Sequence, residues 1–306
     1  MIEKAQNKGV GSFCLQHIVS LSEKSHTPIF LRVFMTNPAQ NLYKRFGFEV
    51  YDQTQSHYLM QYVPGKPTDE GNGLITGGQR QRSMSMPNDA MNAIKTIYSS
   101  GGRFDEMLTY ANRKLKRWEA DAAAMFPAKA SVLDIGCGKG REAFCLHEMG
   151  FGVTGLDISE TCVEAARATA KAHGLDMAFV VSNGRDLPFA EAAFDVVIIW
   201  AQTFGLFADE ESRRHMLDEC QRVLKRGGLL SFSTHDKEYL RAHYPAFLVG
   251  DVFHPFADGE LAYMTYTIDE LAALAEEAGF QVITCQRGSV YTAQDGTVLH
   301  CACQRT

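Results

Sequence analysis

The sequence of 306 residues predicts an α/β protein whose main domain is a largely parallel sheet with an antiparallel C-terminal hairpin. Apolar runs alternate with helical patterns from residue 91 to the C-terminus, which is typical of a parallel α/β sheet. The run DVVIIW (195–200) is almost wholly apolar, as a strand buried on both faces should be. The last two strand patterns are joined by a turn containing Gly and Asp, which predicts a hairpin.

The strands of this domain follow one another in a regular order. A helix around residues 106–125 is expected before the first strand. A second helix, 161–173, should end at Gly174 as its C-cap. The helix before the fifth strand is expected to end at 225–228 (KRGG), where cations lie near the negative helix terminus. The predicted strands are 131–136, 152–158, 177–183, 195–200, 229–235, 280–288 and 297–305.

The chain divides into three segments. Residues 1–63 alternate helical and strand patterns. Residues 64–90 are rich in Gly, Pro, Ser and polar residues and nearly free of bulky apolar ones. Such a run buries too little surface to offset its ordering entropy, so we predict a flexible linker. Residues 91–306 form the main domain.

Composition and charge limit the function. Residues 91–306 carry 21 Lys/Arg and 29 Asp/Glu, which argues against a nucleic-acid substrate because polyanion binders usually present a basic face. The apolar runs are shorter than a membrane span, and residues after Met1 predict no secretory signal. The eight cysteines are scattered, which favours a reducing cytoplasm over a disulfide framework. No ligand pair has metal-site spacing.

A glycine-rich turn follows the first strand of the domain. Its sequence, VLDIGCGKG (132–140), places Gly136, Gly138 and Gly140 at GxGxG spacing between a strand and a helix. Glycine lets the backbone turn sharply and approach a ligand, while the helix start presents free N–H groups. Dinucleotide sites need GxGxxG, so this spacing, with Asp134 ahead of it, suits a ligand end without phosphates. A purely structural glycine turn is the alternative.

A second acidic residue ends the next strand. A carboxylate at Asp157 can accept two hydrogen bonds from ribose hydroxyls. The alternative is that Asp157 caps the following helix, but Ser159 is the better N-cap. We therefore favour the ribose role.

Polar residues also follow the third and fourth strands. Asn183 and Gly184 end the third strand, where a polar side chain beside a small residue can bind an adenine edge. Gln202 lies just beyond the fourth strand. Ligands of open parallel sheets bind outside the carboxyl ends of the strands, where all these residues fall.

Residues 91–306 resemble a class I S-adenosylmethionine (SAM)-dependent methyltransferase. VLDIGCGKG resembles the family's first motif, GLDIS its acidic second-strand motif, and FDVVIIW and LKRGGLLSFST its later ones. The resemblance implies a Rossmann-like sheet of seven strands, SAM as the cofactor and methyl transfer as the reaction.

The resemblance also implies roles for single residues. Many members have an Asp that contacts adenine at the position of Asn183, which keeps an acceptor oxygen but loses the charge. Trp200 and Gln202 match the position that backs the methionine moiety. Related enzymes use an N-terminal lid whose Tyr and Arg meet the same moiety, although Arg103 in an exposed turn is the alternative. The predicted cofactor residues are Tyr98, Arg103, Asp134, Gly136, Cys137, Gly138, Gly140, Asp157, Ile158, Asn183, Gly184, Trp200 and Gln202.

His235, at the end of the fifth strand, is the candidate catalytic base. A base is needed only when the acceptor arrives protonated. A surface or structural histidine is the alternative. The aromatic region between Glu238 and Tyr266 is the predicted substrate cap, or a cover for the sheet edge.

Residues 1–63 resemble the C-terminal half of a GNAT acetyltransferase. The match is carried by the turn QNKGVG (6–11), the strand 29–34 and a helix containing Tyr43. The first strands and the acceptor site of that family are missing, so we expect no acetyl transfer by this chain. A remnant with a packing role is one interpretation. Borrowing strands from a second copy, in a homo-oligomer, is the other.

Three classes of function follow from the sequence. The first is a methyltransferase acting on a small molecule, which the acidic balance favours. The second is a methyltransferase acting on protein or RNA, which a basic groove would indicate. The third is a SAM-binding module without catalysis.

Overall fold

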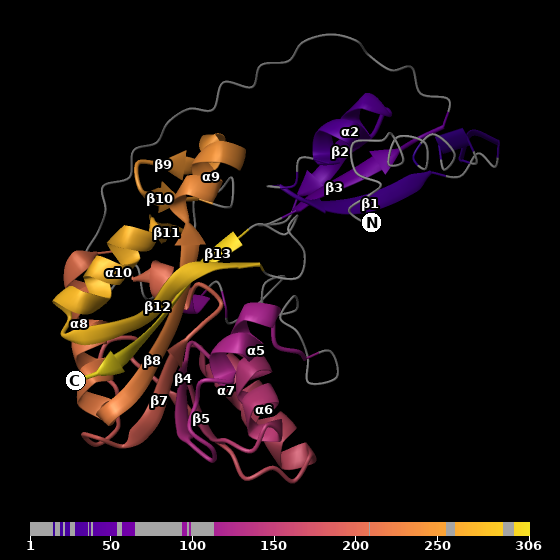
Figure 1. Ribbon diagram of the computed structural model, residues 1–306. Helices are drawn as coiled ribbons and strands as arrows, with labels where there is room; N and C mark the ends of the chain where they lie inside the picture. Colours follow the sequence, from indigo (N-terminus) through magenta and orange to yellow (C-terminus); the bar gives the residue numbers. More distant parts are fainter. Residues whose placement is uncertain are drawn as a thin grey trace. The chain divides into compact units, whose positions relative to one another are not determined.

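The computed structural model describes residues 15, 19–20, 22–24, 28–35, 37, 39–53, 57–64, 94–96, 98, 113–207, 209–254, 261–289 and 297–306 (Figure 1). The described residues up to Pro64 belong to one compact unit, and those from Ile94 onward to a second. Apart from Pro64, the predicted linker lies outside the described residues. The three segment boundaries proposed from the sequence therefore stay predictions.

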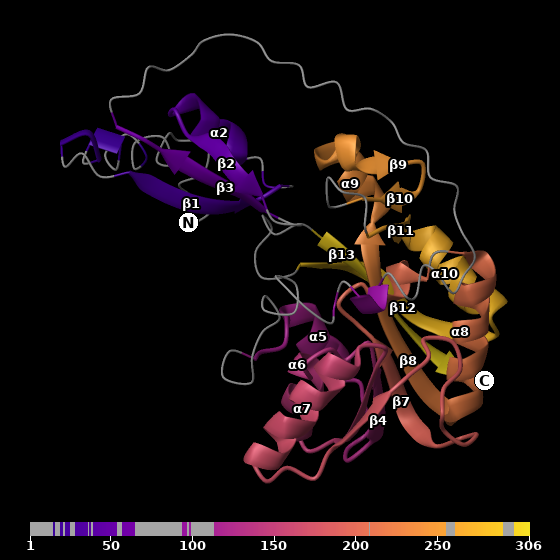
Figure 2. The same cartoon turned by 180° about the vertical axis from the view of Figure 1, so that it is seen from behind.

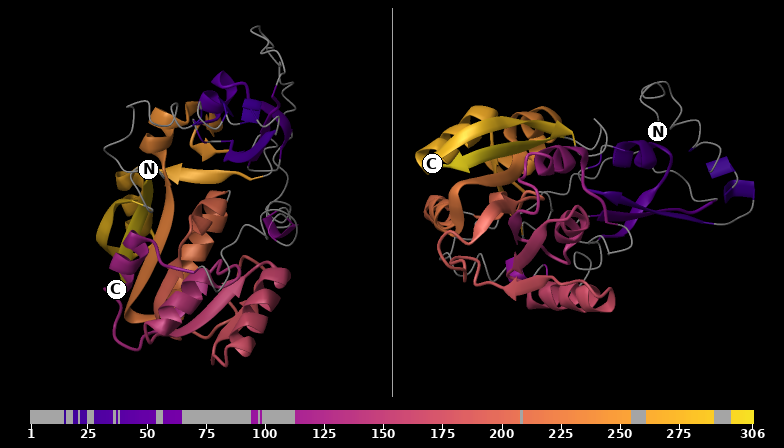
Figure 3. Two further views of the ribbon diagram at one scale, coloured as in Figure 1. Left: turned by 90° about the vertical axis from the view of Figure 1, so that its right-hand side faces the viewer. Right: turned by 60° about the horizontal axis from the view of Figure 1, so that its bottom comes forward.

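The larger unit is built on a mixed, largely parallel sheet of ten strands. Seven of them run in the order β6, β5, β4, β7, β8, β13, β12, and the first five are parallel to one another. β13 is antiparallel to both β8 and β12, so the predicted C-terminal hairpin is present at one edge (Figure 3). The strands are β4 (Ser131–Ile135), β5 (Gly152–Asp157), β6 (Ala178–Val181), β7 (Phe194–Ile199), β8 (Leu224–Asp236), β12 (Phe280–Ser289) and β13 (Thr297–Arg305).

Helices cover both faces of this sheet (Figures 1 and 2). One face carries α5 (Arg117–Ala123), α6 (Arg141–Glu148) and α7 (Glu160–Ala172). The opposite face carries α8 (Glu210–Val223) and α10 (Ile268–Glu277). The sheet is thus the middle of three layers, as the alternation of strands and helices predicts.

Each face has its own hydrophobic core, and β7 contributes to both. Val196 and Ile198 pack with the residues of α5, α6 and α7, whereas Val197 and Ile199 pack with those of α8 and α10. Successive side chains of a strand point to opposite faces, so a strand between two helical layers must be apolar throughout. All four side chains are fully buried, which explains the uninterrupted apolar run.

The start of the fifth strand differs from the prediction. The expected helix through 225–228 was wrong, because α8 ends at Val223 and β8 begins at Leu224. Leu224 pairs with Phe194 of β7, so tertiary pairing overrides the cationic helix-end pattern. Lys225 instead donates to Asp195 at 2.8 Å.

Short elements follow β8, in the region predicted as an aromatic cap. β11 pairs with β8 in parallel at Thr265 and Tyr266, and β10 and β9 add to it as antiparallel strands. The elements are α9 (Lys237–His243), η4 (Pro245–Phe247), β9 (Leu248–Val249), β10 (Val252–Phe253) and β11 (Tyr263–Tyr266), and η3 (Thr203–Leu206) lies earlier, after β7. The role of this region as a substrate cap stays a prediction.

The smaller unit holds a three-stranded antiparallel sheet in the order β1, β3, β2. Val33, Phe48 and Met60 form its buried centre, against which Tyr43 packs. The expected strand 29–34 is confirmed, but the turn at 6–11 lies outside the described residues. The acetyltransferase resemblance therefore stays a prediction. The elements are β1 (Ile29–Phe34), α2 (Ala39–Arg45), β2 (Glu49–Gln53) and β3 (His57–Tyr62).

Two general expectations concern the described residues alone. Within them, no helix is long and apolar enough to cross a membrane. Six of the seven cysteines that the structure describes are buried.

Candidate cofactor site

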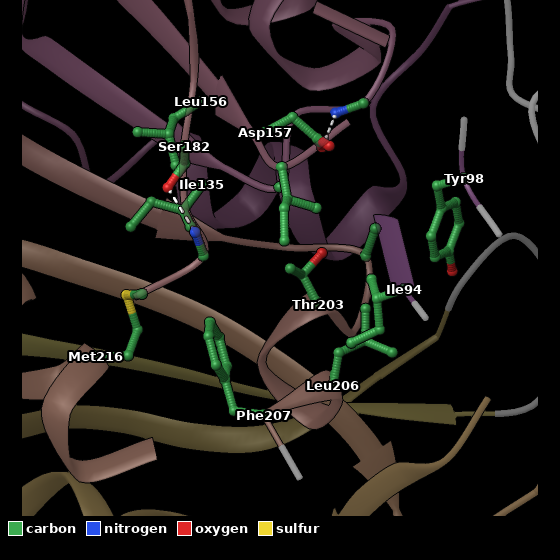
Figure 4. A pocket seen from close by; sticks show the side chains of 15 residues that line it. Ile94, Tyr98, Ile135, Leu156, Asp157, Ser182, Thr203, Leu206, Phe207 and Met216 are labelled. Carbon is green, nitrogen blue, oxygen red and sulfur yellow. Dashed lines mark hydrogen bonds between the residues drawn. The ribbon is translucent and has the colours of Figure 1, made fainter. Parts of the chain in front are cut away.

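A cavity of about 280 Å³ lies at the carboxyl ends of the parallel strands (Figure 4). This is the edge at which open α/β sheets bind their ligands. Its walls come from the ends of β4, β5 and β6, from the segment after β7 and from α8. The lining residues are Ile94, Tyr98, Ile135, Gly136, Gly138, Leu156, Asp157, Ile158, Ser182, Gly184, Ala201, Thr203, Leu206, Phe207 and Met216.

The cavity and one of the two cores share side chains. Ile135, Leu156, Phe207 and Met216 line the cavity and also belong to the core beneath α8 and α10. Figure 4 shows these side chains around the same space as Thr203 and Leu206. Most of the lining is therefore apolar, with polar groups only at a few points, as is usual for small-molecule sites.

The glycine turn after β4 forms one wall of the cavity. Gly136 and Gly138 line it, and both have positive φ, at 78° and 51°. A Cβ on Gly136 would lie 2.5 Å from Cγ2 of Thr203, so a larger residue would force Thr203 to shift, at a φ that L side chains rarely adopt. Gly140 does not line the cavity, but it is the left-handed N-cap of α6. The sequence correctly placed this turn at a strand-to-helix junction.

Asp157, at the end of β5, holds the glycine turn in place. Its Oδ2 accepts a hydrogen bond from the Gly138 N–H at 2.7 Å, and its Oδ1 accepts one from the Ser159 N–H at 2.8 Å. Burial raises the pKa of this carboxyl, while these N–H groups act in the opposite direction. Ser159 is the N-cap of α7, accepting from the Cys162 N–H. Ser159, and not Asp157, is therefore the N-cap of α7, and the ribose role of Asp157 stays a prediction.

Asp134 lies in β4, within the protein and away from the cavity wall. Its side chain is 2% exposed, and its Oδ2 has no hydrogen-bond partner among the described residues. Burial, with the nearby carboxylate of Glu142, raises the pKa of Asp134 well above its usual range. A buried carboxyl oxygen without a hydrogen-bond partner requires an explanation, such as a bound water or a ligand group. Cys137 is also buried in the turn, which its small size permits.

The end of β6 contributes small groups to the cavity. Ser182 and Gly184 line it, and the Ser182 Oγ accepts from the Gly184 N–H at 3.0 Å. Asn183 instead is exposed, and its Oδ1 accepts from the N–H groups of Arg185 and Asp186. Asn commonly closes such a turn on its own backbone, so the adenine role predicted for its side chain lacks a contact with the cavity.

Beyond β7, neither of the two predicted cofactor residues, Trp200 and Gln202, lines the cavity. Trp200 is 2% exposed, donates from Nε1 to Ser231 Oγ at 2.7 Å and packs on Trp118, so it lies in the core and not on the cavity wall. Gln202 has a left-handed backbone and a buried Nε2 without a partner among the described residues. Their neighbours Ala201 and Thr203 form the wall instead.

Tyr98 joins the cavity to the region after β8. It lines the cavity, and its hydroxyl lies 2.9 Å from that of Tyr263. His235, half-buried, packs edge-to-face on Tyr263 and Phe253 at 5.0 Å, and does not line the cavity. Burial, with a smaller contribution from Lys116, lowers the pKa of His235 to about 4. Its imidazole is therefore neutral at pH 7. Arg103 lies outside the described residues.

Sequence reasoning thus identified six of the lining residues, namely Tyr98, Gly136, Gly138, Asp157, Ile158 and Gly184. The apolar ends of β4 and β5 could have been added, because the last side chains of those strands must border the same edge. Met216 carries no such signal, since it lies mid-helix in α8, far along the chain.

Comparisons with known proteins agree with this arrangement. A family model described as a methyltransferase domain matches residues 132–228. Demethylmenaquinone methyltransferase of Tropheryma whipplei is 31% identical over 186 residues, which cover 56% of this chain and 75% of that protein. The 27-O-demethylrifamycin SV methyltransferase of Amycolatopsis mediterranei is 32% identical over 181 residues, which cover 57% of this chain and 63% of that protein.

A solved structure shares the fold. It is the 1,6-didemethyltoxoflavin-N1-methyltransferase of Burkholderia thailandensis, crystallised with 1,6-didemethyltoxoflavin and S-adenosylhomocysteine. Its TM-score is 0.57 at 19% identity, and the match covers 74% of this chain and 93% of that one. The motifs, the sheet and the sequence relatives lead to one conclusion: the chain belongs to the SAM-dependent methyltransferase family.

Proposed function

We propose that this chain transfers the methyl group of SAM to a small-molecule acceptor, with the described cavity holding the cofactor. The carrying observation is the largely apolar cavity at the strand ends, bordered by the glycine turn and by Asp157. Two relatives are named for small-molecule acceptors, a rifamycin and demethylmenaquinone. The acidic balance of residues 91–306 supports the same class of acceptor.

The residues present fit the cofactor. A Cβ on Gly136 would meet the side chain of Thr203, so glycine lets the backbone of the turn approach this part of the cavity wall closely. We assign the methionine end to this turn, which the buried carboxyl of Asp134 precedes by two residues. The second lone pairs of the Asp157 oxygens serve the ribose hydroxyls. The apolar lining, with Ile158 and Met216, covers the adenine.

SAM, when bound, supplies an electrophilic methyl group on a sulfonium. The protein's contribution is to align the acceptor and to exclude water. The apolar wall of the cavity serves exclusion, and Tyr98 and Thr203 offer hydroxyls for orientation. If the acceptor arrives protonated, the neutral imidazole of His235, which packs on Tyr263, is the predicted proton acceptor for a substrate placed beside it.

Binding of S-adenosylhomocysteine (SAH) to the full chain tests the cofactor assignment. We expect micromolar affinity by calorimetry, and a loss of about thirtyfold or more in Ile158→Asp, because the carboxylate would have to be desolvated against an apolar ligand face. Ile158 lines the cavity and is partly exposed, so the change should leave the fold intact. The matched control is Ile283→Asp, at a 52% exposed isoleucine of β12 outside the cavity. It should bind SAH as the wild type does.

Transfer of labelled methyl groups from SAM to fractionated cell extracts tests the acceptor class. We expect label in the fraction of small metabolites. Label only in protein or RNA would contradict the small-molecule acceptor, and no SAH binding by the folded wild type would contradict the cofactor assignment itself.

A further inference from the structure

A group of buried charged side chains lies beneath the glycine turn. Glu119 of α5 is 0% exposed, Asp134 of β4 is 2% exposed and Glu142 of α6 is 6% exposed. Two cations accompany these three carboxyls, Arg141 and the largely buried Lys116. Of these three carboxyls, the proposed function involves only Asp134, so the grouping of buried carboxyls has no explanation in it.

Both cations of the group are engaged with the two glutamates. Arg141 donates to the two carboxylate oxygens of Glu119 at 2.7 and 2.8 Å, and its Nη2 also contacts Glu142. The Nζ of Lys116 lies 3.8 Å from Glu119, whose Oε2 accepts from the Lys116 N–H. Bidentate pairing of this kind is the strongest arrangement available to a buried arginine.

Asp134 has no comparable partner. No ion pair or hydrogen bond joins it to a cation within the described residues, and its Oδ2 is unpartnered. An ionised carboxylate in that position would be desolvated without compensation, so the neutral acid is the favoured form.

Most of the groups that face Asp134 raise its pKa. From α6, Glu142 raises its pKa and Arg141 lowers it, while Asp157 of β5 and Glu119 of α5 raise it further, after burial as the main cause. The Cys137 thiol stays neutral, because burial and the two aspartates raise its pKa. Lys116 lowers the pKa of Glu142, against the larger effect of burial.

Of these two acids, Asp134 is the one without a cation partner among the described residues. Burial raises the pKa of Glu142 as well, but Glu142 contacts Arg141 directly, and that cation acts in the opposite direction. Asp134 lies two residues before Gly136, at the base of the turn assigned to the amino-acid end of the cofactor.

We propose that Asp134 is protonated in the free enzyme and loses this proton when the cationic amino end of the cofactor binds at the glycine turn. The O–H bond of the carboxyl breaks, the proton passes to solvent buffer, and the carboxylate left behind balances the charge of the bound ammonium. This coupling rests on the proposed function. It makes cofactor binding release up to one proton at any pH below the free-state pKa of Asp134.

This coupling determines how the affinity for SAH changes with pH. Because the ligand binds the ionised form of Asp134, affinity should rise by up to about tenfold per pH unit as the pH approaches the free-state pKa of Asp134, and level off above it. Above about pH 8 the ligand's own amino group loses its proton and affinity should fall again.

Calorimetric titration of SAH into the full chain, in buffers of different ionisation enthalpy at one pH, measures the protons released. We expect about one for the wild type and about none for Asp134→Asn, which should bind roughly 10- to 100-fold more weakly. Glu142→Gln is the matched control. It removes the carboxylate that raises the pKa of Asp134, so release at the same pH should be smaller but present.

The free protein offers a test without cofactor. In carboxyl-¹³C-aspartate-labelled protein, one resonance should keep the shift of a neutral acid at a pH where exposed aspartates are ionised, and it should be absent from Asp134→Asn. A raised folded-state pKa also makes the stability of the fold depend on pH. The protonated Asp134 contributes stability at low pH, and this contribution is lost as the pH rises through the folded-state pKa. Asp134→Asn should therefore abolish this decline.

The outcomes separate the two ideas. SAH binding without proton release, release that persists in Asp134→Asn, or an Asp134 carboxyl that titrates in the ordinary range each overturns the coupling and leaves the cofactor site standing. Failure of the folded wild type to bind SAH overturns both. If Asp134→Asn binds too weakly for calorimetry, the carboxyl resonance of the free wild type decides.

Discussion

Replacing Asp157 by alanine should weaken SAH binding by at least about a hundredfold and destabilise the protein by about 2–4 kcal/mol. The carboxylate accepts the N–H groups of Gly138 and Ser159. Both donors lie in buried backbone, and each unpartnered donor costs about 1–3 kcal/mol. Loss of the carboxylate therefore has two effects. The glycine turn loses a hydrogen bond that holds its backbone, and the ribose loses its proposed hydrogen-bond acceptor. Calorimetry and urea unfolding measure the two effects separately.

Asp209→Ala is the matched control for this change. Asp209 is the N-cap of α8 and accepts from the Ser212 N–H at 2.7 Å, so it too loses a carboxylate bonded to backbone, but it does not line the cavity. It should cost about 1 kcal/mol of stability and leave SAH affinity unchanged. A folded Asp157→Ala protein that binds SAH within about threefold of the wild type would refute the assignment of this carboxylate.

Trp200→Phe should cost about 2–3 kcal/mol of stability and change the SAH affinity of the folded protein by less than about twofold. Trp200 is buried between Trp118 and Phe126, and its N–H donates to Ser231, which also contacts His300 at 3.0 Å. Phenylalanine leaves part of that volume unfilled and removes the only donor of the indole. Urea unfolding and calorimetry on the same preparation give both quantities.

The other tryptophan provides the comparison. Trp118 is buried in the same core, but its Nε1 has no partner among the described residues. Trp118→Phe should therefore cost less than Trp200→Phe, and the difference estimates the Trp200–Ser231 hydrogen bond. A tenfold or greater loss of SAH affinity in Trp200→Phe at unchanged stability would instead favour the cofactor role that the motif predicted.

The sequence was most informative where a residue's role depends on its own strand. The apolar run of β7, the glycine turn after β4 and Asp157 at the end of β5 were all placed correctly, because each depends on local backbone geometry and strand polarity. The family resemblance also anticipated the largely parallel sheet and its final hairpin, but not β9, β10 and β11, which bring the strands of this sheet to ten among the described residues.

It was least informative where partners come from distant segments. Which face Trp200 joins depends on Trp118 and Ser231, from two other elements. The Asn183 side chain accepts hydrogen bonds from the backbone N–H groups two and three residues further along the chain. A motif does not show whether such a residue bonds to its own backbone or to a ligand. The early start of β8 arises from pairing with Phe194, which the helix-end pattern of KRGG concealed.

The four side chains common to the cavity and to the core under α8 and α10 have a consequence for the two layers of the enzyme. A molecule bound there adds contacts to the core under α8 and α10, whereas no residue of the core beneath α5, α6 and α7 lines the cavity. The supply of cofactor in the cell would then slow the exchange of backbone amides with solvent most in the layer of α8 and α10, and would lengthen the time for which that side of the enzyme resists proteolysis.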